Sequence, residues 1–229
     1  MRRGIFVTGT DTGVGKTVAS AALVHALRDA GETVVPMKPI AAGAEPRGGR
    51  WVNEDTLALA NAAGLGDDAM ERVTPVLLRE PMSPHIAAAR EGREITLAPI
   101  VRELGRPHPA NAFHVVEGVG GFLVPLADEL DTIDLARAVA LPVVLVVGLR
   151  LGCLNHSLLT ARAVEASGLP LAGWIANAID PHMSVPDENV ETLRRRLRAP
   201  LLGRFPWSER PDARALARRL DVRPLLAHR

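Results

Sequence analysis

The chain contains two lysines, Lys16 and Lys38, and twenty-five arginines. On a solvated surface either cation serves, so a general preference for arginine explains why lysine is rare but not where the two lysines lie. An ammonium is a compact, rotatable charge that can enter a phosphate-binding loop, whereas a guanidinium is a planar fork with a different reach. We therefore expect both lysines to contact phosphate. The alternative is that they fall at these positions by chance.

Lys16 lies in a glycine-rich segment, GTDTGVGKT at residues 9–17, which follows the apolar run 5–7 and precedes a helical pattern. In a strand–turn–helix arrangement of this kind, backbone N–H groups and the helix dipole converge on a phosphate. Lys16 would reach the β- and γ-phosphates, and the Thr17 hydroxyl would ligate Mg²⁺. The usual four-residue spacing between the two glycines would begin at Thr10, so the match is not strict. The alternative is a glycine-rich turn that happens to end in Lys-Thr.

Composition excludes several classes of protein. With 229 residues and 47% hydrophobic content, the chain is expected to form a single domain over residues 1–229. A net charge of +1 and only 3% aromatic residues leave no basic, stacking surface, so we expect no nucleic acid partner. The apolar runs are too short or too interrupted for an export signal or a membrane span. One cysteine, Cys153, cannot form an internal disulfide, which is consistent with a cytoplasmic location.

The hydrophobic pattern predicts an α/β fold. Apolar runs without polar alternation indicate strands buried on both faces, and these alternate with helical stretches, so we expect a mainly parallel sheet with helices on both faces. The predicted strands span residues 5–8, 33–38, 113–116, 143–147, 171–176 and 201–205. The predicted helices span residues 17–30, 54–63, 133–140, 155–166 and 189–197. Segments 46–50 and 106–110 are expected to be surface loops.

Ligands of such sheets bind at the carboxyl ends of the strands. Lys38 ends the second predicted strand and would lie beside the phosphate loop if the first two strands are neighbours. Its alternative is a solvated lysine. Glu117 ends an apolar strand before a Gly-Val-Gly-Gly turn and is a natural Mg²⁺ ligand, with capping of nearby N–H groups as its alternative. Asp55, near a helix start, is equally consistent with metal binding and with a favourable helix dipole contact.

These residues belong to a series of motifs that resembles the dethiobiotin synthetase family. In order along the chain the motifs are residues 9–17 (GTDTGVGKT), 38–41 (KPIA), 53–55 (NED), 83–85 (SPH), 116–121 (VEGVGG), 151–156 (LGCLNH) and 172–177 (AGWIAN). The resemblance runs from Phe6 to about Trp207. It implies a P-loop NTPase-like fold and a homodimeric, ATP- and Mg²⁺-dependent ligase that joins 7,8-diaminopelargonate and CO₂ into dethiobiotin, in the synthesis of biotin. The implied intermediates are a carbamate and a carbamic-phosphoric mixed anhydride.

The resemblance also implies residue roles. Lys16, Lys38 and Thr12 would be catalytic, and Thr17, Asp55 and Glu117 would hold the metal. The residues expected to bind the nucleotide are Gly13, Val14, Gly15, Lys16, Thr17, Val18, Asp55, Glu117, Gly118, Val119, Gly120, Asn177, Phe205, Pro206, Trp207 and Glu209. The residues expected to bind the substrate are Thr12, Lys38, Ala42, Gly120, Cys153, Leu154 and Asn155.

One part of the substrate site is implied to come from a second subunit. Residues 152–155 open a predicted helix whose N–H groups can accept an anion. By resemblance, this turn of the partner subunit holds the substrate carboxylate. Cys153 would contribute through its backbone, and a small buried residue is the natural interpretation of its side chain.

The chain departs from the family pattern at three positions. Gly13 stands where many members have Glu, Ala42 where many have a substrate-contacting Ser, and Ala178 where an acid often follows the Asn. The missing hydroxyl at position 42 removes at most one hydrogen bond, worth about 1 kcal/mol. Ala178 leaves another nucleoside triphosphate open as an alternative to ATP.

Three other classes are weighed against this interpretation. A partition- or septum-type ATPase has a signature lysine five residues before the position of Lys16, and Asp11 stands there. A glutamine-dependent cobyrinate-type ligase would need a glutaminase domain, for which the chain has no room. A nucleotide kinase would be expected to have a lid-like arginine cluster, and none is found in the sequence.

Overall fold

The computed structural model describes residues 2–227 and has a six-stranded sheet at its centre. All five pairings between neighbouring strands are parallel. In spatial order the strands are β12 (Leu201–Phe205), β11 (Leu171–Ala178), β10 (Val143–Leu149), β1 (Arg3–Gly9), β7 (Phe113–Glu117) and β2 (Val34–Met37). The six strands predicted from apolar runs are therefore confirmed.

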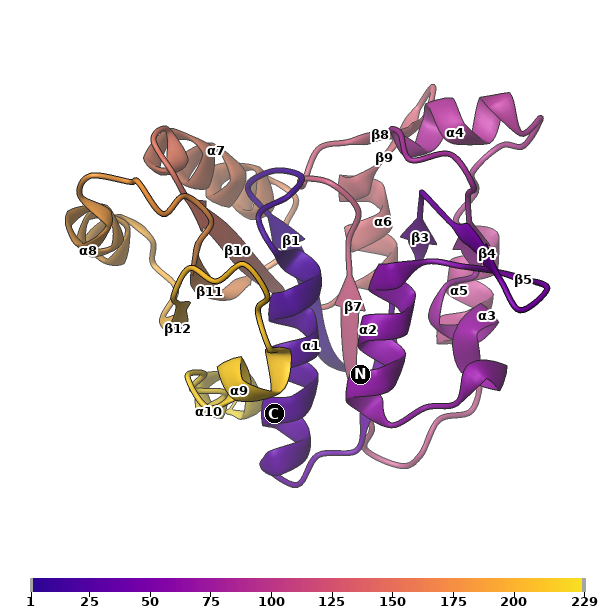
Figure 1. The fold of residues 1–229 in the computed structure, drawn as a ribbon, viewed down its shortest axis with the longest axis horizontal. Helices are drawn as coiled ribbons and strands as arrows, with labels where there is room; N and C mark the ends of the chain where they lie inside the picture. Colours follow the sequence, from indigo (N-terminus) through magenta and orange to yellow (C-terminus); the bar gives the residue numbers. More distant parts are fainter. Residues whose placement is uncertain (1, 228–229) are drawn as a thin grey trace.

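Helices cover both faces of the sheet (Figure 1). Alternate residues of one strand enter different cores: Ile5 and Val7 of β1 pack with the helix α1 (Lys16–Asp29), while Phe6 packs in the core on the other face. Side chains on successive strand residues point to opposite faces, so a strand that is apolar throughout needs cover on both sides. The expected α/β class and P-loop NTPase-like layering are confirmed.

The five predicted helices are all present. They are α1, α2 (Glu54–Ala63), α6 (Thr132–Val139), α7 (Cys153–Ala166) and α8 (Pro186–Arg196). The structure adds shorter ones, namely η1 (Asp67–Ala69), α3 (Met70–Val73), α4 (Pro84–Arg90), α5 (Ala98–Leu104), α9 (Ala213–Ala217) and α10 (Arg223–Leu226). At three to seven residues, these helices are too short for helical periodicity to show in the sequence.

The condition set for Lys38, that the first two strands are neighbours, is not met. β2 pairs with β7, and β7 lies between β2 and β1. After α1 the chain therefore skips one strand position, and β7, which comes later in the sequence, occupies that position. Lys38 reaches the site across the end of β7 rather than from the strand beside the phosphate loop.

The smaller sheets lie outside the central one. They are β3 (Ile40–Ala41) with β6 (Val76–Leu77), β4 (Glu45–Arg47) with β5 (Arg50–Val52), and β8 (Pro125–Ala127) with β9 (Leu130–Asp131). The loop expected over residues 46–50 is therefore partly wrong, because β4 and β5 form an exposed antiparallel hairpin. Gly48 and Gly49 turn this hairpin with φ of 56° and 79°. Residues 106–110 lie outside helices and strands, as expected.

None of the helices within residues 2–227 has the length and apolar character that a membrane crossing requires.

Candidate active site

A cavity of about 620 Å³ opens beyond the carboxyl ends of β1, β7 and β2. This is the edge of a parallel sheet at which ligands bind. The lining residues are Thr12, Gly13, Gly15, Lys16, Thr17, Lys38, Ala42, Asp55, Pro81, Met82, Ser83, Pro84, Glu117, Val119, Gly120 and Val124. The structure thus brings both lysines, the proposed metal ligands and much of the glycine-rich loop to one place.

The glycine-rich loop joins β1 to α1 and depends on left-handed backbone at its end. Gly15 has φ of 85°, and α1 begins directly after it at Lys16. A Cβ on Gly15 would lie 2.2 Å from the Nδ2 of Asn177. That same amide donates a hydrogen bond of 2.9 Å to the carbonyl of Val14. Glycine is therefore required at position 15 both by φ and by the close approach of β11.

Lys38 is enclosed between two carboxylates. Its Nζ lies 2.6 Å from Oε1 of Glu117 and 3.0 Å from Oδ2 of Asp55, and it donates a further hydrogen bond of 3.1 Å to the carbonyl of Gly118. The side chain of Lys38 is 3% exposed and that of Glu117 is fully buried. The predicted alternative of a solvated lysine is wrong.

This arrangement shifts the pKa values of the group. Burial disfavours the charged form of Lys38, but the carboxylates of Glu117 and Asp55 outweigh burial and raise the pKa of Lys38. Burial alone would raise the pKa of Asp55, but the charge of Lys38 and the hydrogen bond from Thr17 outweigh burial and lower it. The ammonium and the carboxylate therefore both stay charged.

Thr17 completes the cluster. Its Oγ1 lies 2.7 Å from Oδ1 of Asp55 and 2.9 Å from Oε1 of Glu117, and its single proton can serve one of them at a time. The other oxygen of Glu117, Oε2, is buried without a hydrogen-bond partner. A hydroxyl and two carboxylates with an unused oxygen form a donor set suited to Mg²⁺, which prefers hard oxygen ligands. Within residues 2–227 no three His, Cys, Asp or Glu side chains gather into a metal cluster, so the candidate site has two carboxylates.

Lys16 is held differently. Its Nζ donates to the carbonyl of Asp11 over 2.9 Å, and no carboxylate within the described residues pairs with it directly. Burial, aided by the charge of Lys38, lowers the pKa of Lys16 to about 8. Asp11 itself is tied to Arg150 at the end of β10. The carboxylates of Glu117, Asp55 and Asp11 favour the charged form of Lys16 only from a distance, and an anion such as phosphate would supply a direct partner.

Several predicted residues lie outside this cavity. Asn177 contacts the phosphate loop from behind, at Val14. Phe205 is fully buried in the core, so any nucleotide contact it makes comes from its backbone, while Trp207 is 45% exposed. Residues 153–155 begin α7 and line no part of the cavity, and Cys153 is buried as expected.

The sequence assigned no role to one wall of the cavity. Residues 81–84, at the start of α4, and Val124 lie opposite the phosphate loop. Ser83 followed by Pro84 is a helix-start signal, and the pair was already visible as part of a family motif. Nothing local, however, indicated that this helix start faces the lysines, because the packing is set by residues far apart in the chain.

Comparisons with known proteins agree on the family. A family model described as "AAA domain" matches residues 3–214. The ATP-dependent dethiobiotin synthetase BioD of Ralstonia nicotianae is 55% identical, with 97% of this chain and 96% of that protein covered. The enzyme of the same name from Aromatoleum aromaticum is 51% identical, with 96% and 97% covered.

Among solved structures, the septum site-determining protein MinD of Pyrococcus horikoshii, complexed with Mg-ADP, has a TM-score of 0.54 at 17% identity and covers 90% of this chain and 82% of its own. That likeness shows the fold alone. The septum-type protein shares the fold of this chain at 17% identity, whereas the relatives that are 51% and 55% identical over nearly the full length are dethiobiotin synthetases. The chain belongs to the family of ATP-dependent dethiobiotin synthetases, within the wider group described as AAA domain proteins.

Proposed function

We propose that this chain, as a single catalytic domain, converts 7,8-diaminopelargonate, CO₂ and ATP into dethiobiotin, ADP and phosphate. One substrate amine takes up CO₂ as a carbamate. A carbamate oxygen then attacks the γ-phosphorus, ADP leaves, and a carbamic-phosphoric anhydride forms. The second amine attacks the carbonyl carbon and closes the cyclic urea as phosphate departs. The observation that carries this proposal is the buried Lys38 between Glu117 and Asp55, facing the loop that holds Lys16.

The two lysines have distinct tasks. Lys16, at the first position of α1, is placed to hold the β- and γ-phosphates together with the loop N–H groups. Lys38 approaches from the other wall and neutralises charge on the transferred γ-phosphoryl oxygens and on the carbamate. Fixed charges that are already oriented lower the barrier most where charge develops during transfer.

Thr17, Asp55 and Glu117 are the residues that would hold Mg²⁺. When bound, Mg²⁺ would offset the negative charge of the phosphates during transfer. The unpartnered Oε2 of Glu117 supports this assignment. Replacement of Asp55 by Asn should raise the Mg²⁺ concentration for half-maximal activity about tenfold or more, because one charged ligand is lost. Glu54→Gln, an exposed neighbour on α2, is the matched control and should leave the Mg²⁺ requirement unchanged.

The substrate would occupy the part of the cavity between Thr12, Gly120 and Ala42. A Cβ at Gly120 would lie 2.9 Å from Val124, so this glycine lets the backbone approach the substrate. Ala42 offers no hydroxyl, and we expect a weaker hold on the substrate there without loss of the chemistry. Met82 and Val124 supply apolar contacts for the alkyl chain.

The adenine would lie beyond the phosphate loop, near Asn177 and the exposed Trp207. The amide of Asn177 donates to Val14, which leaves its oxygen and one N–H for a purine edge. Pro206 and Glu209 follow β12 at the same end of the sheet. ATP is the proposed nucleotide.

We propose a homodimer in which the partner's α7 holds the substrate carboxylate. Residues 153–155 form the first turn of α7, outside the cavity of their own subunit. Leu151, just before this turn, is 95% exposed and Leu159 is 59% exposed. Leu159 lies in the middle of α7, and exposed large apolar side chains this close together are typical of a surface covered in an assembly. A cytoplasmic location is proposed from the buried free thiol of Cys153.

The reaction is tested with purified protein, diaminopelargonate, bicarbonate and MgATP, following dethiobiotin by mass spectrometry and ADP in the same sample. Equal amounts of dethiobiotin and ADP are expected. Formation of ADP without dethiobiotin would support the phosphate site and contradict the assignment of the substrate. Omission of bicarbonate should abolish both products, and the Lys16→Ala variant is the control for contaminating ATPases.

A further inference from the structure

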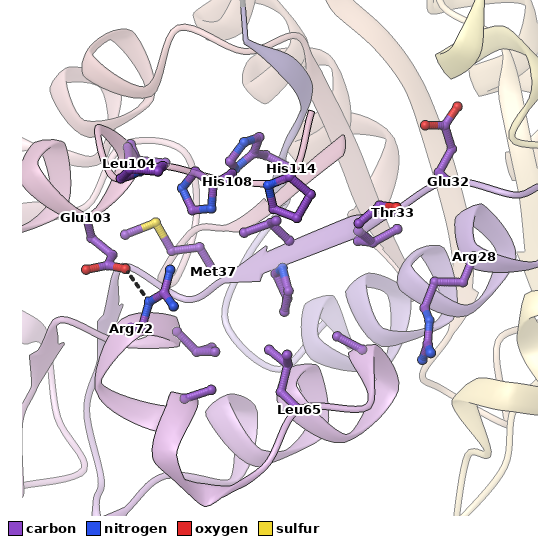
Figure 2. A pocket seen from close by; sticks show the side chains of 18 residues that line it. Arg28, Glu32, Thr33, Met37, Leu65, Arg72, Glu103, Leu104, His108 and His114 are labelled. Atoms are coloured by element: carbon purple, nitrogen blue, oxygen red, sulfur yellow. Dashed lines mark hydrogen bonds and ion pairs between the residues drawn. The ribbon is translucent and has the colours of Figure 1, made fainter. Parts of the chain in front are cut away.

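A second pocket lies along the free edge of β2, away from the proposed active site. Its volume is about 510 Å³, and none of its lining residues lines the active-site cavity. Figure 2 shows this pocket from close by, with walls from β2, the end of α2, α3, the end of α5 and the segment around His108. A volume of this size suits a small organic ligand.

Two histidines in this pocket have unused nitrogens. His114 of β7 is 4% exposed, and its Nδ1 has no hydrogen-bond partner. The Nε2 of His108 is also buried without a partner. The two rings meet edge to face, with centroids 4.8 Å apart. A buried nitrogen without a partner costs about 1–3 kcal/mol, so two of them in one pocket wall indicate a missing partner.

His114 is neutral at physiological pH. Burial, together with the neighbouring His108 and Arg2, lowers the pKa of His114 to about 4. A neutral imidazole donates through one nitrogen and accepts through the other. The complementary ligand group is therefore uncharged and able to hydrogen-bond.

The pocket also has one cation without an acidic partner. Arg72 is paired with Glu103 at 3.0 Å, as the dashed line in Figure 2 marks, and Glu32 is paired with Arg3. Arg28 donates to the carbonyl of Ala62, and no carboxylate among residues 2–227 forms an ion pair with it. Arg28 is therefore the position at which this pocket can accept a negative charge.

Between these polar groups the wall is apolar. Figure 2 shows Met37 next to the histidines, Leu65 on the far side of the pocket from them, and Arg28 to one side. We propose that this pocket binds a small amphiphilic carboxylate, with its carboxylate at Arg28, its hydrocarbon part against Met37 and Leu65, and an uncharged hydrogen-bonding group at His108 and His114.

Two probes separate the parts of this proposal. Octanoate has a hydrocarbon chain and a carboxylate, and dethiobiotin adds an uncharged cyclic urea. The imidazole ¹⁵N resonances of His108 and His114 report on the pocket, because neither histidine lines the active-site cavity. Both probes are expected to shift these resonances in a saturable manner, and dethiobiotin is expected to bind more tightly. Occupancy of the active site by dethiobiotin would instead perturb residues near Lys16 and leave the two imidazoles unchanged.

Variants complete the test. Arg28→Ala should weaken both probes about tenfold or more, because a charge-assisted hydrogen bond is lost, and Arg28→Lys should recover part of the affinity. His108→Ala should weaken the binding of dethiobiotin and leave the binding of octanoate nearly unchanged. Arg102→Ala, which removes an exposed cation of α5 outside the pocket, should change neither. Absence of a saturable shift for both probes, or equal affinity in the well-folded Arg28→Ala protein, would overturn the proposal.

Discussion

At the scale of single residues, the distribution of buried charge marks the site. Among residues 2–227, the charged side chains that are buried are Lys16, Lys38 and Glu117, and all three line one cavity. Burial of a charge is costly unless a partner compensates it. Lys38 and Glu117 form a direct ion pair, whereas the one hydrogen-bond partner of the Lys16 ammonium among the described residues is a carbonyl. Lys16 is the lysine of the phosphate loop, where the ligand is expected to supply a direct negative partner.

The Lys38→Ala variant should retain its fold and lose turnover by about a hundredfold or more, because a fixed positive charge at the transferred phosphoryl group is removed. Without Mg²⁺, the Lys38→Ala protein should also be less stable to unfolding than the unchanged protein by about 3 kcal/mol, since Glu117 keeps a buried charge without its partner. Steady-state kinetics and thermal unfolding with and without Mg²⁺ measure both effects. Near-normal turnover would remove Lys38 from the mechanism. Lys38→Arg tests shape, and its planar group should not restore full activity in so enclosed a site.

His114 should make the protein sensitive to acid. The pKa of His114 is lowered to about 4 in the folded protein, against 6.5 for a histidine in water, so the unfolded chain binds the proton more tightly. Stability is then lost as the pH falls from about 6.5 toward 4, by up to about 3 kcal/mol from this group. Urea unfolding at a series of pH values should show a shallower decline for His114→Leu than for the unchanged protein. Parallel curves would contradict the assignment.

At the scale of elements, strand β11 supports the loop between β1 and α1. Asn177, near the end of β11, donates a hydrogen bond to the carbonyl of Val14, and its amide comes so close to Gly15 that no Cβ would fit there. The loop is thus held by its own left-handed glycines and by a side chain more than 160 residues away in sequence. A change on β11 should therefore be felt in phosphate binding, although β11 contributes nothing to the cavity wall.

Gly15→Ala should weaken ATP binding strongly. The backbone at position 15 has φ of 85°, which strains any residue with a Cβ, and the new Cβ would collide with the Nδ2 of Asn177. Gly13→Ala is the matched control: φ is 75° there, but no atom lies within 4 Å of the new Cβ. It should show only the strain of about 1–2 kcal/mol. The double variant Gly15→Ala/Asn177→Ala removes the collision and should bind ATP better than Gly15→Ala alone. Calorimetric titration with ATP measures all of these variants, and equal effects at both glycines would contradict the collision.

At the scale of the whole molecule, some of the candidate site residues line the cavity of one chain and others lie outside it. The phosphate loop, both lysines and the proposed metal ligands lie within one chain, while the start of α7 lies outside the cavity. Isologous pairing of two copies places the same surface at both sites, so each copy can complete the other. Figure 1 shows α7 beside the loop that follows β1, at the same end of the sheet.

Mixing two inactive variants tests this division. Lys38→Ala disables the site in its own chain, and Asn155→Ala would disable the site of the partner. In a mixed dimer one site has both defects and the other has neither. An equal mixture that exchanges subunits should therefore recover about a quarter of the unmixed wild-type activity. No recovery after demonstrated subunit exchange would place Asn155 in the same site as Lys38 of its own chain. Each variant alone, treated in the same way, is the control.

Part of this molecule could be predicted from local patterns. Apolar runs identified the six strands of the central sheet, and α2 was predicted with its observed bounds, because Asn53 caps its start and Gly64 ends it. The phosphate loop and Glu117 were predicted from residue type and position after a strand. The short helices α3 and α4 were not, since a helix of four to seven residues has too few turns to show a period.

The sequence by itself determined the class of fold, the lysines of the glycine-rich loop and of the second strand end, and the family, because these depend on residue types and short spacings. Only the tertiary structure decided that β7 lies between β1 and β2, that Lys38 is buried between Glu117 and Asp55, and that Asn177 holds the phosphate loop from behind. The contacts of Lys38 with Glu117 and of Asn177 with Val14 join residues that are 79 and 163 positions apart. Strand order and side-chain packing follow from which of many long-range arrangements buries the cores best, and no local pattern along the chain specifies that choice.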